Sequence, residues 1–192
     1  LIDGPVDTSA PELAGANITD KSRCTIEASP QGARHGTDMA TILVSPYTGV
    51  APDATLHSYQ LSNYESISAG TCEVNGKKLD DFDTLINQAV DDGAQIISIS
   101  QGTGRLGDDV KWAIANAIAR GVIIVASAGN TADNANNAHL GSWSGVVGVS
   151  AINTDGTFAS YSSWGNGVVT AAVGGPFNRL DPVTNQPTIG EG

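Results

Sequence analysis

Hydrophobic residues recur along this chain in two different periods, and the two periods alternate. Between residues 79 and 90 they fall three or four positions apart, as on one face of an α-helix, and acidic residues occupy the first turn, where the helix dipole stabilises them. Residues 108–120 repeat the pattern, and Gly93 and Gly121 follow the two segments as C-terminal stops. The pattern predicts two amphipathic helices.

Short, continuous hydrophobic runs lie between and after these helices, at residues 94–100, 122–126 and 145–152. Such runs are typical of strands that are buried on both faces of a parallel sheet. Because strands and helices alternate, we expect an α/β fold, with three layers formed by a mostly parallel central sheet and helices on its two faces. Residues 176–192 contain three prolines and little periodicity, so we expect an extended loop there.

Length and composition fit one ordered, compact domain. The chain has 192 residues, of which 40% are hydrophobic and 15% are charged, and 23 of them are glycines. The formal net charge of −11 repels phosphate backbones and anionic lipids, so we expect no nucleic-acid partner. No apolar run approaches the roughly 20 residues that span a bilayer, so we also expect no membrane span.

The two cysteines, Cys24 and Cys72, lie in polar, turn-rich stretches. They can form one disulfide if the protein is exported, or they can remain two free thiols, and the sequence leaves both readings open. Neither belongs to a Cys-x-x-Cys or Cys/His cluster, so the sequence offers no support for zinc binding or thiol chemistry.

Several side chains can do chemistry, although each has an ordinary structural reading as well. Asp3 follows an apolar strand, at the edge where open α/β sheets build their sites, yet such an aspartate is usually a turn former. His35 enters a helix-like segment after Gly32, and a lone histidine is more often structural. Asn130 follows a strand that ends in small residues, where its amide can donate to a developing oxyanion or belong to a loop.

In combination and in this order, these segments resemble the subtilisin-like serine proteases over nearly the whole chain. The resemblance is carried by the stretch around Asp3 and by His35-Gly36-Thr37, Ser100-Gln101-Gly102, Ala128-Gly129-Asn130 and residues 158–165. Asp3 and His35 lie 32 residues apart, about the interval in the subtilisin triad. His35 and Asn130 lie 95 residues apart, against about 91 in that template, a difference that one surface-loop insertion absorbs.

The resemblance implies a serine endopeptidase with an Asp-His-Ser triad. His35 would take the proton from a serine hydroxyl and return it to the leaving amine, while Asp3 would fix the imidazole tautomer. Asn130 would donate its side-chain amide to the tetrahedral oxyanion.

The same resemblance implies two substrate-binding segments. Ser100, Gln101 and Gly102 would pair with the substrate backbone as an added strand. Ser127, Ala128 and Gly129 would line the primary specificity pocket, where the lack of a charged residue favours a neutral side chain. Leu79 and Phe82 would line a more distant apolar subsite, or they belong to the hydrophobic core.

The serine itself is the largest departure from the family pattern. The template places it about 66 residues after the asparagine, beyond Gly192. We therefore expect residues 1–192 to be a catalytic domain that lacks its extreme N-terminal part and its serine-bearing C-terminal segment. Proteolytic processing, deliberate truncation and a split gene remain open as origins. Asp38 stands where the family often has a second histidine, which places a carboxylate near the base.

The expected partners are a peptide or protein substrate and a C-terminal fragment, or following segment, that carries the serine. Without that serine, residues 1–192 should be inactive. The alternative function is a catalytically inactive module of the same fold that binds peptides beside residues 100–102. Retention of Asp3, His35 and Asn130 favours the enzyme, because a binding module has no need of all three. We expect no cofactor; structural calcium is common in the family, but no carboxylate cluster here has a convincing ligand spacing. The resemblance also implies a secreted or extracytoplasmic location.

Overall fold

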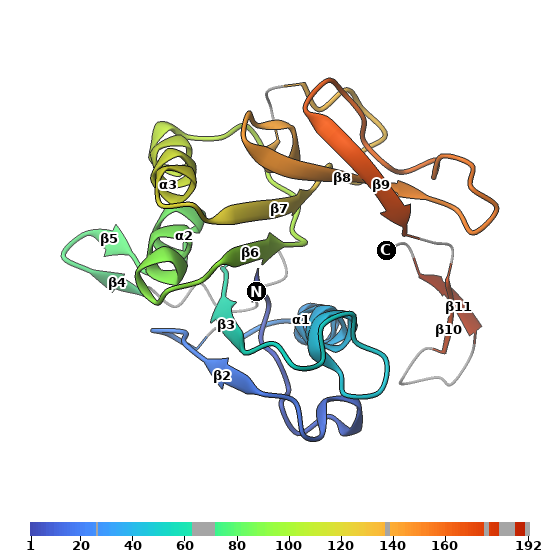
Figure 1. Ribbon diagram of the computed structural model, residues 1–192, viewed down its shortest axis with the longest axis horizontal. Coiled ribbons are helices and arrows are strands. Elements are labelled where there is room, and N and C mark those ends of the chain that lie inside the picture. The colour runs from blue at the N-terminus through green and yellow to red at the C-terminus, as the bar shows by residue number, and fades with distance from the viewer. Residues whose placement is uncertain (26, 63–71, 137–138, 175–176, 181–186, 191–192) are drawn as a thin grey trace. The chain divides into compact units, whose positions relative to one another are not determined.

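The computed structural model describes residues 1–25, 27–62, 72–136, 139–174, 177–180 and 187–190 (Figure 1). They form two compact units. The first unit comprises Leu1–Ser100 and Asp108–Ile123, and the second comprises Gln101–Gly107 and Ile124–Gly192. Within the described ranges, no helix is both long and apolar enough to cross a membrane.

In its described residues, the first unit contains a parallel sheet of three strands, three further strands, one 3-10 helix and three α-helices. Its elements are β1 (Ile2–Asp3), the 3-10 helix η1 (Pro11–Leu13), β2 (Ile18–Asp20), α1 (Pro30–Val44), β3 (Leu56–Gln60), β4 (Glu73–Val74), β5 (Lys77–Lys78), α2 (Phe82–Asp91), β6 (Ile96–Ile99) and α3 (Asp108–Ala119). The sheet has the order β1-β3-β2, and β3 pairs in parallel with both neighbours. The parallel pairs confirm the α/β prediction for this unit.

Helix α1 packs against the first part of the chain. It begins at Pro30, where the Ser29 side chain caps it by accepting a hydrogen bond from the Gly32 backbone N–H at 3.0 Å. Its buried residues lie four apart, so they form one stripe along the helix: Gly32, Gly36, Ala40 and Val44. Ala40 and Val44 share a hydrophobic cluster with Leu1, Leu13 and Leu56. The small residues of the stripe bring α1 close to the strand that carries Asp3.

The two amphipathic helices lie where the hydrophobic period predicts them, and they pack on each other. Helix α2 begins three residues later than expected. Leu79 is not helical because its backbone N–H donates to the Cys72 carbonyl at 2.8 Å, and Asp81 takes the extended backbone of an N-cap residue. The strand predictions also hold, within one or two residues, as β6 and as two strands of the second unit.

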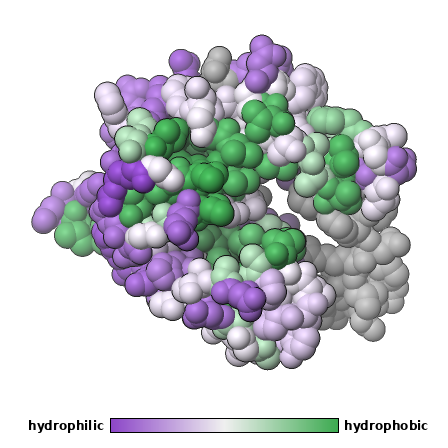
Figure 2. Space-filling view, in the orientation of Figure 1, coloured by the Kyte–Doolittle hydropathy of each residue, from purple (hydrophilic) through white to green (hydrophobic). Residues whose placement is uncertain are grey.

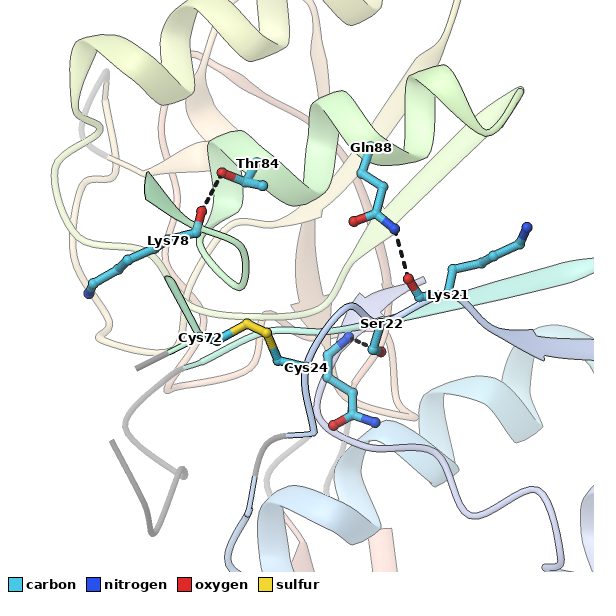
Figure 3. The surroundings of a disulfide bond; sticks show 8 residues. Lys21, Ser22, Cys24, Cys72, Lys78, Thr84 and Gln88 are labelled. Atoms are coloured by element: carbon cyan, nitrogen blue, oxygen red, sulfur yellow. Dashed lines mark hydrogen bonds between the residues drawn. A yellow bond between two sulfur atoms is a disulfide. The ribbon is translucent and has the colours of Figure 1, made fainter. Parts of the chain in front are cut away.

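A disulfide joins Cys24 to Cys72 and settles the question that the sequence leaves open (Figure 3). It links the segment after β2 to the segment before β4. Two hydrogen bonds tie α2 to the same region: the Gln88 amide donates to the Lys21 carbonyl, and the Thr84 hydroxyl donates to the Lys78 carbonyl, both at 2.7 Å. The first unit therefore has a covalent cross-link as well as a packed core.

Not all hydrophobic side chains of the first unit are buried. Figure 2 shows hydrophobic surface over the region where Figure 1 draws β6 and the beginning of β7 (Ile123–Ser127). Ile96 and Ile123 are 62% and 51% exposed, whereas their neighbours Ile97 and Ile124 are buried. This alternation is the period-two pattern of a strand with only one covered face, so the expectation that these two strands are buried on both faces is wrong.

The second unit is built on parallel strands. Its elements are β7, whose first residue belongs to the first unit, the 3-10 helix η2 (Leu140–Ser142), β8 (Val146–Ile152), β9 (Val168–Val173), β10 (Phe177–Leu180) and β11 (Pro187–Gly190). Strand β8 pairs in parallel with both β7 and β9. The turn at residues 153–156, which the sequence predicts, follows β8.

The prediction of an extended loop for residues 176–192 is wrong where the structure describes it. Strands β10 and β11 pair antiparallel, with Phe177 opposite Gly190 and Leu180 opposite Pro187. Pro187 is the first residue of β11, a position that tolerates a missing backbone N–H. The pairing rests on backbone hydrogen bonds between two four-residue strands, which leave almost no hydrophobic period in the sequence.

Candidate functional site

Asp3 is the last residue of β1 and is completely buried, with 0% of its surface exposed. Its Oδ1 accepts a hydrogen bond from the Gly4 backbone N–H at 2.7 Å. A buried carboxylate is costly unless charged or polar groups compensate it, so a second contact is needed to hold the charge here.

His35 supplies that contact from α1. Its Nδ1 lies 2.7 Å from Asp3 Oδ1, and about a third of its side chain remains exposed. Because an ionised carboxylate only accepts hydrogen bonds, the proton of this bond belongs to Nδ1. Neutral His35 then has an unprotonated Nε2, the state that a general base requires.

Glycines allow the two side chains to meet. A Cβ atom added at Gly36 would lie 2.5 Å from the carbonyl oxygens of Gly4 and Pro5, and one added at Gly4 would lie 2.4 Å from the Gly32 carbonyl oxygen. These are backbone atoms that cannot swing aside. Helix α1 therefore rests directly on the chain that leaves β1, and this close approach sets the Asp3–His35 distance.

Asp38, the residue that departs from the family pattern, lies one turn further along α1. Its Oδ2 is 3.6 Å from Arg34 Nε, an i,i+4 ion pair on the same helix. Arg34 therefore partly offsets the carboxylate that the departure places near His35.

The second unit carries the segment predicted to stabilise an oxyanion. Strand β7 ends at Ser127, and the Ser127 hydroxyl accepts a hydrogen bond from the Gly129 backbone N–H at 3.1 Å. Ala128 and Gly129 are buried, and Asn130 is exposed. Gly129 has φ +109°, a backbone conformation that residues with a side chain rarely adopt. This turn brings the chain from a buried strand to an exposed asparagine within three residues.

The predicted substrate-backbone segment begins in the first unit and continues in the second. Ser100, which follows β6, is partly buried and belongs to the first unit, whereas buried Gln101 and exposed Gly102 belong to the second. The structure thus places Asp3 in contact with His35 in the first unit, and places residues 127–130 in one turn at the end of β7 in the second unit. Leu79 and Phe82 are both partly exposed, and their part in a subsite stays a prediction.

Sequence reasoning missed three residues of the second unit. Ser163 hydrogen bonds to Gly129 and Thr131, on either side of Asn130. Asp133 accepts a hydrogen bond from Ser163 and lies close to His139. Residues 158–165 were recognised as a recurrent family segment, but the sequence alone assigns no role to Ser163 within it. Among the described residues, no group of three or more His, Cys, Asp or Glu side chains is placed to hold a metal ion.

Comparison with known sequences gives one family over nearly the whole chain. The model of the subtilase family, Peptidase_S8, matches residues 1–188. Thermitase of Thermoactinomyces vulgaris is 28% identical over 182 residues, which cover 91% of this chain and 61% of thermitase. The major intracellular serine protease of Bacillus subtilis (strain 168) is 32% identical over 145 residues, which cover 69% of this chain and 42% of that protein.

Solved structures give the same result. A mutant of the protease domain of PatA has a TM-score of 0.75 and 26% identity, covering 91% of this chain and 66% of that one. The prenylagaramide maturation protease PagA has a TM-score of 0.71 and 28% identity, covering 91% of this chain and 61% of that one. The chain therefore spans less than two thirds of the length of each of these relatives.

Proposed function

The chain belongs to the subtilase family, and from that premise we propose that it supplies the acid–base half of a serine endopeptidase. The observation that carries the proposal is the 2.7 Å contact between the buried Asp3 carboxylate and His35 Nδ1. The nucleophilic serine comes from a segment that follows residue 192, or from a second chain. Residues 1–192 alone hydrolyse no peptide by the triad route.

In this proposal His35 moves the proton. Its Nε2 accepts the proton of the serine hydroxyl as the oxygen attacks a peptide carbonyl, and then returns it to the leaving amine. Asp3 keeps the other ring nitrogen protonated and stabilises the imidazolium that forms. The buried setting of Asp3 supports this role, because little water competes for the hydrogen bond.

The second unit supplies binding groups. Asn130 donates its side-chain amide to the oxyanion of the tetrahedral intermediate, a contribution of about 2.7–4 kcal/mol in the subtilisin example of this same family. Ser100, Gln101 and Gly102 pair with the substrate backbone, and Ser127, Ala128 and Gly129 line the pocket for a neutral side chain. The exposure of Asn130 and Gly102 supports access by a peptide.

We further propose that the protein works outside the reducing cytoplasm. The Cys24–Cys72 disulfide supports this location, because disulfides persist in oxidising compartments.

The test uses the longest natural protein that contains residues 1–192, together with any chain that co-purifies with it. A serine-directed fluorophosphonate probe should label one serine outside residues 1–192, and a casein digest should yield new peptide ends. His35→Ala should abolish both signals, while His57→Ala, a change at a histidine in β3, should leave both in place.

Absence of labelling and cleavage in the wild-type protein would overturn the proposal. Retained affinity for peptides in that case would instead support the inactive peptide-binding module.

A further inference from the structure

In the second unit, the buried Ser163 contacts the residues on both sides of Asn130, within the Asn130 segment (residues 129–133). The Ser163 backbone N–H donates to the Gly129 carbonyl at 2.8 Å. Its hydroxyl accepts a hydrogen bond from the Thr131 backbone N–H at 3.4 Å and lies 3.2 Å from the Thr131 hydroxyl. Ser163 itself has 0% of its surface exposed. The residues immediately before and after Asn130 are therefore hydrogen-bonded to one fully buried residue.

The Asn130 segment needs such attachment, because its backbone is strained. Ala132 has φ +51°, which is unfavourable for a residue with a Cβ atom, whereas Gly129 adopts its φ of +109° without that penalty. Two further backbone hydrogen bonds hold the segment in place: Ala132 N–H to the Tyr161 carbonyl at 2.9 Å, and Trp164 N–H to the Asp133 carbonyl at 3.0 Å. Strain of this kind persists only where surrounding contacts over-determine it.

Asp133 extends the attachment through its side chain. Its Oδ1 accepts hydrogen bonds from the Ser163 hydroxyl at 2.7 Å and from the Thr131 hydroxyl at 2.8 Å. The hydrogen bond from Ser163 has the larger effect and the one from Thr131 the next, and together they hold the pKa of the Asp133 carboxyl below its usual range. The ionised form of Asp133 is thus the form that the segment stabilises.

His139 connects this cluster to the predicted substrate-backbone segment within the same unit. Its Nε2 lies 3.7 Å from Asp133 Oδ2, and its Nδ1 donates to the Thr103 carbonyl. The Leu140 backbone N–H also donates to the Thr103 hydroxyl, at 2.8 Å. Thr103 directly follows Gly102, so the chain of contacts runs from the residues that flank Asn130 to the residue after the predicted substrate-backbone segment.

We propose that Ser163 and Asp133 are positioning residues for the oxyanion hole, and that His139 connects them to residues 101–103. The inference rests on the proposed endopeptidase function. The cluster is not a second catalytic triad, because the Ser163 hydroxyl donates to a carboxylate rather than to an imidazole and no surface of Ser163 is open to a substrate.

Ser162 provides a matched control for the test. It is 1% exposed, and its hydroxyl accepts from the Ala151 backbone N–H at 2.8 Å and donates to the Ser163 carbonyl at 3.2 Å. Among the described residues, its hydroxyl makes no hydrogen bond to residues 129–133. Removing either hydroxyl costs a buried hydrogen bond. Only the Ser163 change removes a contact to the Asn130 segment.

The experiment compares Ser163→Ala with Ser162→Ala in the same natural protein as above. We expect Ser163→Ala to lower kcat about tenfold with KM changed less than about twofold, below the roughly 10²- to 10³-fold cost of losing an oxyanion donor outright. Asp133→Asn, which keeps an acceptor oxygen, should lower kcat less than Asp133→Ala. Equal kcat values for Ser163→Ala and Ser162→Ala would overturn the inference.

A second measurement does not depend on activity. Hydrogen–deuterium exchange of peptides that cover residues 129–133 should accelerate in Ser163→Ala and stay at the wild-type rate in Ser162→Ala. Unchanged exchange in Ser163→Ala overturns the positioning role even if kcat falls. An inactive wild-type protein overturns the proposed endopeptidase function, whereas the exchange result still decides whether Ser163 holds the segment.

Discussion

The two regions that carry candidate chemistry are held by different forces. In the first unit, a packed helix brings His35 to a fully buried Asp3, and glycine-to-backbone contacts set the approach. In the second unit, the segment around Asn130 is held by hydrogen bonds, and in two of them the exposed Asp133 carboxylate accepts from the hydroxyls of Thr131 and Ser163. The first region should therefore be sensitive to added volume, and the second to the loss of single polar groups.

The largest effect should come from a change that leaves packing intact. Asp3→Asn conserves volume but removes the charge that holds the His35 tautomer, and the corresponding change in a serine protease triad lowers kcat about 10⁴-fold. We expect a loss of that order in the active protein, measured by peptide-ester hydrolysis. The exposed Asp7 serves as the control, because Asp7→Asn alters only local bonds to Ser9; a loss below tenfold for Asp3→Asn would contradict the assigned pairing.

A smaller but more diagnostic effect should come from added volume. Gly36→Ala places a methyl group 2.5 Å from two backbone carbonyl oxygens, so α1 must move away from β1. We expect a loss of about 1–3 kcal/mol in the free energy of unfolding, typical of overpacking, together with reduced kcat. Thermal and urea denaturation measure the change in the free energy of unfolding.

Gly107→Ala is the control for that change, since nothing lies within 4 Å of an added Cβ there. If Gly36→Ala were as stable and active as Gly107→Ala, the first region would not depend on close packing.

The smallest effect should be a change in one pKa in the second region. The folded protein holds the pKa of Asp133 below its usual range, first through the Ser163 hydroxyl. Ser163→Ala should raise that pKa towards the usual value of about 3.9, as measured by carboxyl carbon NMR. Because the folded pKa is lowered, the stabilisation is present above the usual value and is lost as the pH falls through the folded pKa. An unchanged pKa in Ser163→Ala would mean that other groups hold Asp133.

The hydrophobic pattern was sufficient for the elements that bury one face of a long segment. It places α2, α3, β6, β7 and β8 to within three residues at their starts, because a buried helix face leaves a period of three or four residues and a buried strand leaves a continuous hydrophobic run. It fails for β10 and β11, whose pairing rests on backbone hydrogen bonds that leave no such period.

The candidate site divides in the same way. The sequence alone determined the chemistry available, since Asp3, His35 and Asn130 are recognisable by order and spacing, and it determined the family that this order resembles. Only the tertiary structure decided which groups touch: His35 with Asp3, Cys24 with Cys72, and Ser163 with the Asn130 segment. These partners lie 30 or more residues apart. Local periodicity reports which face of a segment is buried, whereas contact between distant residues depends on how closely two packed backbones can approach.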